Sequence, residues 1–111
     1  MARASSTTVT IASSGTTSQA IDVGEWLIAG IVTPAALTGV AFTFTGALTE
    51  GGTYRPLVDS TGAAISVTVS ADDHILIEPQ TFAGVSWIKL VSGSTEAAAR
   101  EITLVLHKRE G

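Results

Sequence analysis

The feature that most constrains the fold of this chain is a set of short segments in which apolar and polar or small residues alternate. Four segments follow this period of two: "TVTIA" at 8–12, "VAFTFTG" at 40–46, "AISVTVS" at 64–70 and "EITLVLHKR" at 101–109. Such an alternation places every second side chain on the same face of a β-strand. The pattern therefore predicts antiparallel strands that each turn one face toward a core.

Further apolar segments complete the predicted sheets. Strands are predicted at 25–33, 74–79 and 86–93, and a short pairing segment is expected in "QAIDV". Residues 53–59 are a weaker candidate because Pro56 restricts a strand to a sheet edge or a bulge. Gly, Ser and Asp clusters at short spacing separate these segments and mark turns. Eight or so short strands with such turns indicate a β-sandwich or barrel.

Two short segments have another pattern. The sequence "PQTF" at 79–82 favours a 3₁₀-like turn, and "STEAAAR" at 94–100 favours a single helical turn. Neither is long enough for a substantial helix. The side chains predicted to fill the core are Ile11, Ile28, Phe42, Phe44, Val67, Ile77, Ile88 and Leu104.

The length of 111 residues fits one domain. We expect residues 9–109 to form the all-β domain and residues 1–8, which are polar and precede most of the first periodic segment, to form a flexible N-terminal arm. An arm of this kind can bind a neighbour by adding a strand to an open sheet edge.

The charge content limits the classes of partner. Only 14% of the residues are charged, against roughly 25% in typical globular proteins, so much of the surface must consist of small polar residues or be covered by a partner. The net charge of −4 argues against nucleic-acid binding. A membrane span is not expected, because Pro34 divides the most apolar run. The N-terminus lacks the apolar run of a signal peptide, so we expect the chain to stay where it is made.

The stretch "LTEGGTYRPLVDSTG" at 48–62 could be a ligand-binding loop or a pair of turns. A calcium site needs several oxygen ligands at fixed spacing in one loop, whereas this stretch supplies one acid per turn, Glu50 and Asp59. The order Asp-Ser-Thr-Gly at 59–62 is typical of a type I turn. We therefore predict turns between strands and no metal site.

Catalytic motifs are lacking in the sequence. His74 and His107 are isolated, the chain has no cysteine, and no serine lies in a nucleophile-elbow motif. A small hydrolase remains a rival hypothesis, because carboxylates far apart in sequence can converge on one site. The acids that could do so are Asp22, Asp59, Glu78 and Glu96. Because a domain of this size has little room for a substrate cleft, we predict a protein without enzymatic activity or a cofactor.

Trp26, Tyr54 and Trp87 have three alternative interpretations. They can pack in or around the core, contact a partner protein, or stack on sugars. Trp87 shares its strand face with Lys89, while Ile88 takes the opposite face, so the tryptophan is expected to be partly open to solvent.

Several segments recur in the same order in a known group of proteins: "AIDVG", "GIVTPAALTGVAFTF", "GGTYRPLVDSTG", "IEPQTFAGVSWIKLVSGS" and "ITLVLHKR". From about residue 8 to residue 108 the chain resembles small virion proteins of tailed bacteriophages, of the head decoration (cement) type. The resemblance implies a jelly-roll-like antiparallel β-sandwich on the capsid surface, made in the host cytoplasm. It implies contacts with the major capsid protein or other virion proteins and a homo-oligomer such as a trimer. It carries over no catalytic residue.

Within this interpretation, the residues expected to contact a partner are Arg3, Ser5, Ser6, Thr7, Trp26, Tyr54 and Trp87. The alternative function is a carbohydrate- or receptor-binding module of a tail or fibre, in which the aromatic residues would lie beside a polar groove.

Overall fold

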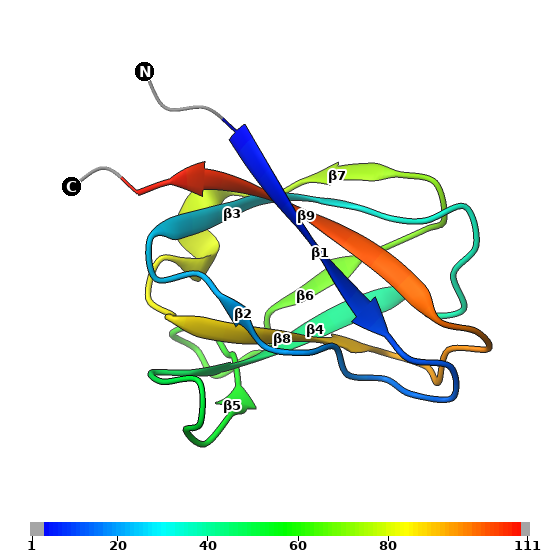
Figure 1. Ribbon diagram of the computed structural model, residues 1–111. Coiled ribbons are helices and arrows are strands. Elements are labelled where there is room, and N and C mark those ends of the chain that lie inside the picture. Colours follow the sequence, from blue (N-terminus) through cyan, green and yellow to red (C-terminus); the bar gives the residue numbers. More distant parts are fainter. Residues whose placement is uncertain (1–3, 110–111) are drawn as a thin grey trace.

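The computed structural model describes residues 4–109, which form one all-β domain of two packed antiparallel sheets (Figure 1). The strands are β1 (Ala4–Ile11), β2 (Ile21–Asp22), β3 (Trp26–Val32), β4 (Ala41–Ala47), β5 (Arg55–Pro56), β6 (Ser66–Thr68), β7 (His74–Leu76), β8 (Trp87–Ser92) and β9 (Arg100–Lys108). A 3₁₀ helix, η1 (Pro79–Phe82), lies between β7 and β8 and confirms the predicted turn at 79–82. No helix among the described residues is long and apolar enough to cross a membrane.

The strands pair as nested layers of one long hairpin. The first strand β1 pairs with the last strand β9, β2 pairs with β8, β3 with β7, and β4 with β5 and β6. Two further pairings, of β3 with β9 and of β4 with β8, roll this hairpin into a sheet ordered β1-β9-β3-β7 and a sheet ordered β2-β8-β4-β5, with β6 also on β4. This order is consistent with a jelly roll, a sandwich of two Greek keys.

The core lies between the two sheets and follows from the alternation in the sequence. In β4 and β8 the buried residues are separated by half-buried ones, as period two requires. Of the eight predicted core side chains, six are buried: Ile11, Ile28, Phe42, Phe44, Ile88 and Leu104. The other two, Val67 and Ile77, are half-buried and pack against this cluster.

A β-bulge in β3 changes which residues of this strand face the core. Ile28 pairs with Leu106 and Gly30 pairs with Val105, so one extra residue, Ala29, is inserted in β3. The insertion lets both Ile28 and Ile31 face the core, where each is fully buried. Without it, two residues three positions apart would lie on opposite faces of the sheet.

Two expectations are corrected by the structure. Residues 4–8, expected as a flexible arm, form most of β1 and pair with β9 over the whole strand, so the expected boundary after residue 8 is wrong for them. Residues 1–3 lie outside the described residues. The helical turn predicted at 94–100 is also absent from the described chain, because the backbone of Glu96 bonds to Ser14 and Gly15 instead of closing a turn.

Candidate interaction surfaces

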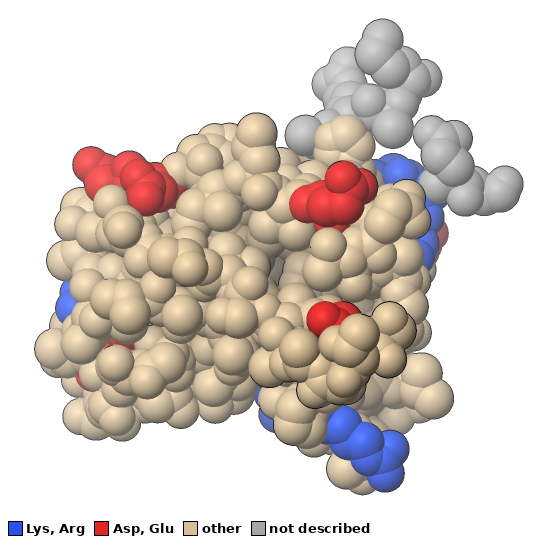
Figure 2. Space-filling model, turned by 180° about the vertical axis from the view of Figure 1, so that it is seen from behind, with Lys and Arg blue, Asp and Glu red and all other residues tan. Residues whose placement is uncertain are grey.

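The surface carries few charges. Figure 2 shows a face that is mostly uncharged, with acidic and basic side chains in small separate groups. The charged residues number 16 of 111, and one of them, Glu96, is fully buried. Contacts with this surface must therefore depend mainly on shape, hydroxyl groups and apolar side chains.

The three expected contact residues of β1 lie at one edge of the four-stranded sheet. Ser5 and Ser6 are exposed and Thr7 is half-buried, and all three are held in register with β9. Arg3, the fourth contact residue expected in this part of the chain, lies outside the described residues. The edge position of β1 is a property of the topology that the sequence pattern did not show.

Trp26 belongs partly to the core. Its side chain is half-buried and packs against the core cluster at the start of β3. The ammonium nitrogen of Lys108 lies 5.3 Å from the centre of the indole ring and 3.3 Å from the carboxylate of Glu25. The structure therefore favours the packing interpretation for Trp26, with a cation–π contact on its outer side.

Tyr54 and Trp87 lie close to the outer face of the five-stranded sheet. Trp87 and Lys89 alternate with the buried Ile88 along β8, so they share the outer face. The Lys89 ammonium nitrogen lies 4.3 Å from the centre of the Tyr54 ring, and the Tyr54 hydroxyl donates to the carbonyl oxygen of Glu50 at 2.8 Å. We call Tyr54, Trp87 and Lys89 the aromatic patch. Trp26, on the other sheet, is not part of it.

The loop at 48–62 consists of turns, as predicted. The Asp59 carboxylate accepts hydrogen bonds from the backbone of Thr61 and Ala63 and from the Thr61 hydroxyl, at 2.7–3.1 Å. These bonds, with that of the Thr61 side chain as the largest cause, hold the pKa of Asp59 below its usual value. Gly62 has a φ of 88°, which a side chain would strain. Across residues 4–109 no group of three or more His, Asp and Glu gathers as metal ligands.

The candidate acids engage different local networks. Asp22 accepts from the backbone of Gly24 at 2.9 Å, Asp59 closes its own turn, and Glu96 binds Arg100. Asp22 lies in β2 and Glu96 in the connection between β8 and β9. The carboxylates of Asp22 and Asp59 thus have a structural explanation within their own turns, and Glu78, the fourth candidate, is exposed immediately before η1.

Glu96 is the residue whose role the sequence did not reveal. Its side chain is fully buried, and its two oxygens accept four hydrogen bonds of 2.8–3.0 Å. The donors are the backbone N–H groups of Thr38 and Gly39, the Ser92 hydroxyl and the Arg100 guanidinium. Burial alone would raise the pKa of this carboxyl, but the four donors outweigh it and lower the pKa to about 2. The ionised Glu96 therefore fastens the β3–β4 connection to the β8–β9 connection.

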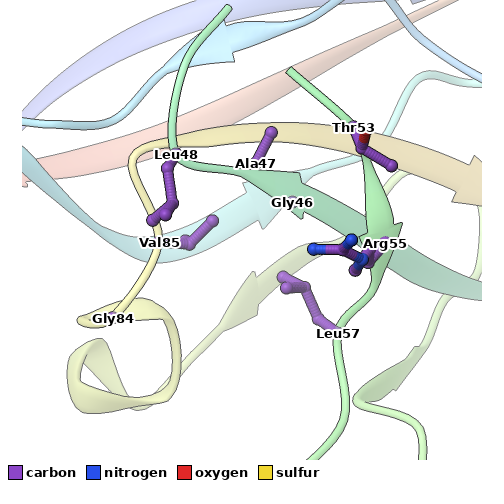
Figure 3. A pocket seen from close by; sticks show the side chains of 8 residues that line it. All are labelled: Gly46, Ala47, Leu48, Thr53, Arg55, Leu57, Gly84 and Val85. Atoms are coloured by element: carbon purple, nitrogen blue, oxygen red, sulfur yellow. The ribbon is translucent and has the colours of Figure 1, made fainter.

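An apolar hollow opens beside β5. It has a volume of about 200 Å³ and is lined by Gly46, Ala47, Leu48, Thr53, Arg55, Leu57, Gly84 and Val85. Figure 3 shows Leu48 and Val85 on one side of this space and Arg55 and Leu57 on the other. Leu48 is 82% exposed. An adjoining hollow of about 180 Å³ shares Leu57, Gly84 and Val85 and reaches Val58 and Ile65. We call the two together the apolar hollow.

One wall of the hollow is held from the far end of the chain. The Arg109 guanidinium donates to the carbonyl oxygen of Ala83 at 2.8 Å and to that of Val85 at 3.3 Å. The loop that carries Gly84 is thereby tied to the residue that follows β9. The sequence did not predict the hollow, because its walls come from four separate segments. The available signal was an apolar residue, Leu48, at the start of a turn.

Gly46 determines the shape of the hollow, and replacing it with alanine is expected to destabilise the fold. A Cβ atom at this position would lie 2.6 Å from Val85 Cγ2 and 2.8 Å from Leu57 Cδ2. We expect Gly46→Ala to lower the free energy of unfolding by about 1–3 kcal/mol, the usual cost of overpacking. Urea unfolding measures this loss. Gly51→Ala is the control, since a Cβ there meets nothing within 4 Å, and an equal effect of both variants would contradict the assignment.

The fold, unlike the sequence, is similar to that of a known protein. No protein-family model matches the sequence, and neither does any curated protein sequence. Among solved structures, the crystal structure of the SPBc2 prophage-derived protein YomS superposes with a TM-score of 0.62 over 97% of this chain and 96% of the YomS chain. This chain shares the fold of YomS. The two sequences are 13% identical, so the likeness to YomS concerns the arrangement of the strands.

Proposed function

We propose that this chain is a structural protein of a tailed-bacteriophage virion and decorates the head by binding its protein lattice. The fold it shares with the prophage-derived protein YomS supports an origin in a phage. The sparse charge and the many exposed hydroxyl groups support a role in broad protein–protein contact. In this proposal the protein is made in the host cytoplasm, resides on the capsid surface, and binds neither nucleic acid nor a cofactor.

The observation that carries the proposal is the apolar hollow. Its two adjoining parts have volumes of about 200 Å³ and about 180 Å³, each below the about 300–1,000 Å³ of ordinary small-molecule sites. Such a space accepts one or two apolar side chains of a partner protein. The exposed Leu48 on its rim adds apolar surface, and the Arg55 guanidinium supplies a donor for an acidic group of the same partner.

The residues that line the hollow favour a protein without enzymatic activity. An active site needs a set of convergent polar groups. The lining offers a single charged side chain, Arg55, and no carboxylate or histidine that could act as a general acid or base.

The alternative is a carbohydrate- or receptor-binding module of the tail or fibre, and the aromatic patch is the observation that favours it. Tyr54 and Trp87 lie near one sheet face, as in a sugar platform. Against it, Lys89 covers the ring of Tyr54 at 4.3 Å, where a sugar would have to stack. Binding in a glycan array, lost in Trp87→Ala, would support this alternative.

The test of the proposal uses phage heads that lack the protein. Purified full-length chain added to such heads is expected to bind at a fixed number of copies per head and to raise the temperature at which DNA escapes, because lattice contacts stabilise the particle. Leu48→Asp is expected to lower the occupancy at least about tenfold, since it places a charge in an apolar contact. Quantitative gel analysis of sedimented heads gives the occupancy.

The matched control is Leu76→Asp. Leu76 on β7 is also 82% exposed but lies on the other sheet, so this variant is expected to bind like the wild type. Wild-type protein that fails to bind heads, or leaves the DNA-release temperature unchanged, contradicts the decorating role. Normal binding of Leu48→Asp contradicts only the assignment of the contact to the hollow.

A further inference from the structure

The outer edge of β1 is long and lacks the usual protection against strand pairing. Natural edge strands are kept short or carry charges, prolines or bulges. The other edge strands follow this rule: β2 and β5 have two residues each, β6 and β7 have three each, and β5 contains Pro56. By contrast, β1 extends over eight residues, ASSTTVTI, without a charge or a proline.

The backbone groups that β1 leaves unpaired can be assigned. The Thr10 N–H donates to the side-chain oxygen of Gln19 at 2.9 Å, so the polar groups of Thr10 point away from β9. Backbone groups alternate between the two edges of an antiparallel strand. The N–H and C=O groups of Ala4, Ser6 and Thr8 therefore also point outward. Within residues 4–109 no strand lies along this part of the edge.

We propose that this edge is the interface between two copies of the chain, in which β1 pairs antiparallel with β1 of the second copy about a two-fold axis at Ser6. In this register Ser6 faces Ser6 of the second copy, and Ala4 faces Thr8. The three outward-pointing residues of one strand thus meet the same three of the other, and each opposed pair exchanges two backbone hydrogen bonds. The two four-stranded sheets join into one continuous sheet.

The register follows from the Gln19 contact. Centring the axis on Thr8 would require the Thr10 backbone, whose N–H already bonds to Gln19. Centring it on Ser6 uses only free groups. The Gln19 side chain and the bridge between Ile11 and Ser18 close the remaining end of the edge, so the open length matches a pairing of residues 4–8.

A second copy is the partner that this edge fits best. The protein has a net charge of −4, and copies that approach one another must meet where acidic side chains are absent. The edge from Ala4 to Thr8 carries none, and its hydroxyl side chains form favourable pairs with their own kind. A two-fold contact also uses the open edges of both copies at once, so association stops at two chains instead of three.

The test of this contact is an engineered disulfide in the full-length chain, which has no cysteine of its own. Directly opposed, hydrogen-bonded residues of an antiparallel pair have Cα atoms about 5.5 Å apart, within the range of a disulfide. We expect Ser6→Cys to form a disulfide-linked dimer on mild oxidation at least about tenfold faster than Thr10→Cys. Thr10 is also exposed on β1, but in this register the Thr10 residues of the two copies lie at opposite ends of the paired strands, several residues apart.

Sedimentation of the wild-type chain over a micromolar dilution series provides the second measurement, with a reversible monomer–dimer equilibrium as the expected result. Equal cross-linking of the two cysteine variants overturns the proposal. A chain that remains a monomer, or that forms a trimer without cross-linking at position 6, also overturns the proposal. The open edge of β1 would then be available to a strand of another protein. No capsid is used, so the outcome is independent of the proposed decorating role.

Discussion

Replacing Glu96 with glutamine is expected to lower the free energy of unfolding by about 3 kcal/mol at neutral pH. The carboxylate accepts four hydrogen bonds, two on each oxygen. A glutamine amide keeps one oxygen and replaces the other with an N–H₂ group, which itself donates. Two of the four donors are then left in a buried place without an acceptor.

The effect of Glu96→Gln is expected to depend on pH. The pKa of Glu96 falls from 4.5 to about 2 on folding, so the folded state binds the proton less readily than the unfolded state. The stabilisation by the carboxylate is then fully present above about pH 4.5 and is lost as the pH falls toward about 2. The difference in stability between wild type and Glu96→Gln is expected to shrink over this range.

Urea unfolding at a series of pH values measures this difference. Glu101→Gln is the control, because it removes the same charge from an exposed position on β9, and its effect should stay within about 0.5 kcal/mol. A difference between wild type and Glu96→Gln that stays constant from pH 7 to pH 2.5 would show that the ionised carboxylate contributes nothing to stability.

The second large effect is expected for Phe44→Ala, with a loss of about 4 kcal/mol in the free energy of unfolding. The Phe44 side chain is 1% exposed, and its ring centre lies 4.8 Å from that of Phe82 in an edge-to-face arrangement at 70°. Truncation removes buried apolar surface, leaves a cavity and breaks the aromatic pair. Because small domains are stable by only about 5–15 kcal/mol, the variant should unfold at a much lower urea concentration.

Thr43→Ala provides the comparison for Phe44→Ala. Thr43 is the preceding residue of β4 and lies on the outer face of the sheet, paired with Val91. Its replacement should cost less than about 1 kcal/mol. Similar midpoints of urea unfolding for Phe44→Ala and Thr43→Ala would mean that the inward and outward faces of β4 have been assigned the wrong way round.

The sequence by itself determined the strands and most of the core. The alternation in "VAFTFTG" assigns Phe42 and Phe44 to one face and Thr43 to the other, because side chains of a strand alternate locally whatever it pairs with. Turn residues act just as locally, so the turn at Asp59–Gly62 was also predicted. The first part of β1, residues 4–8, was not predicted as a strand, because its serines and threonines do not alternate in polarity. Their backbone nevertheless pairs with β9.

Only the tertiary structure decided which segments meet. Glu96 is separated from Thr38 by 58 residues in the sequence. The local propensity of residues 94–100 predicted a helical turn, because propensity contains no information about hydrogen-bond donors in a distant loop. The apolar hollow and the open edge of β1 arise in the same way, from how the nested pairs of strands roll into two sheets. Local periodicity specifies which side chains face a core, whereas contacts between distant segments depend on the topology of the whole chain.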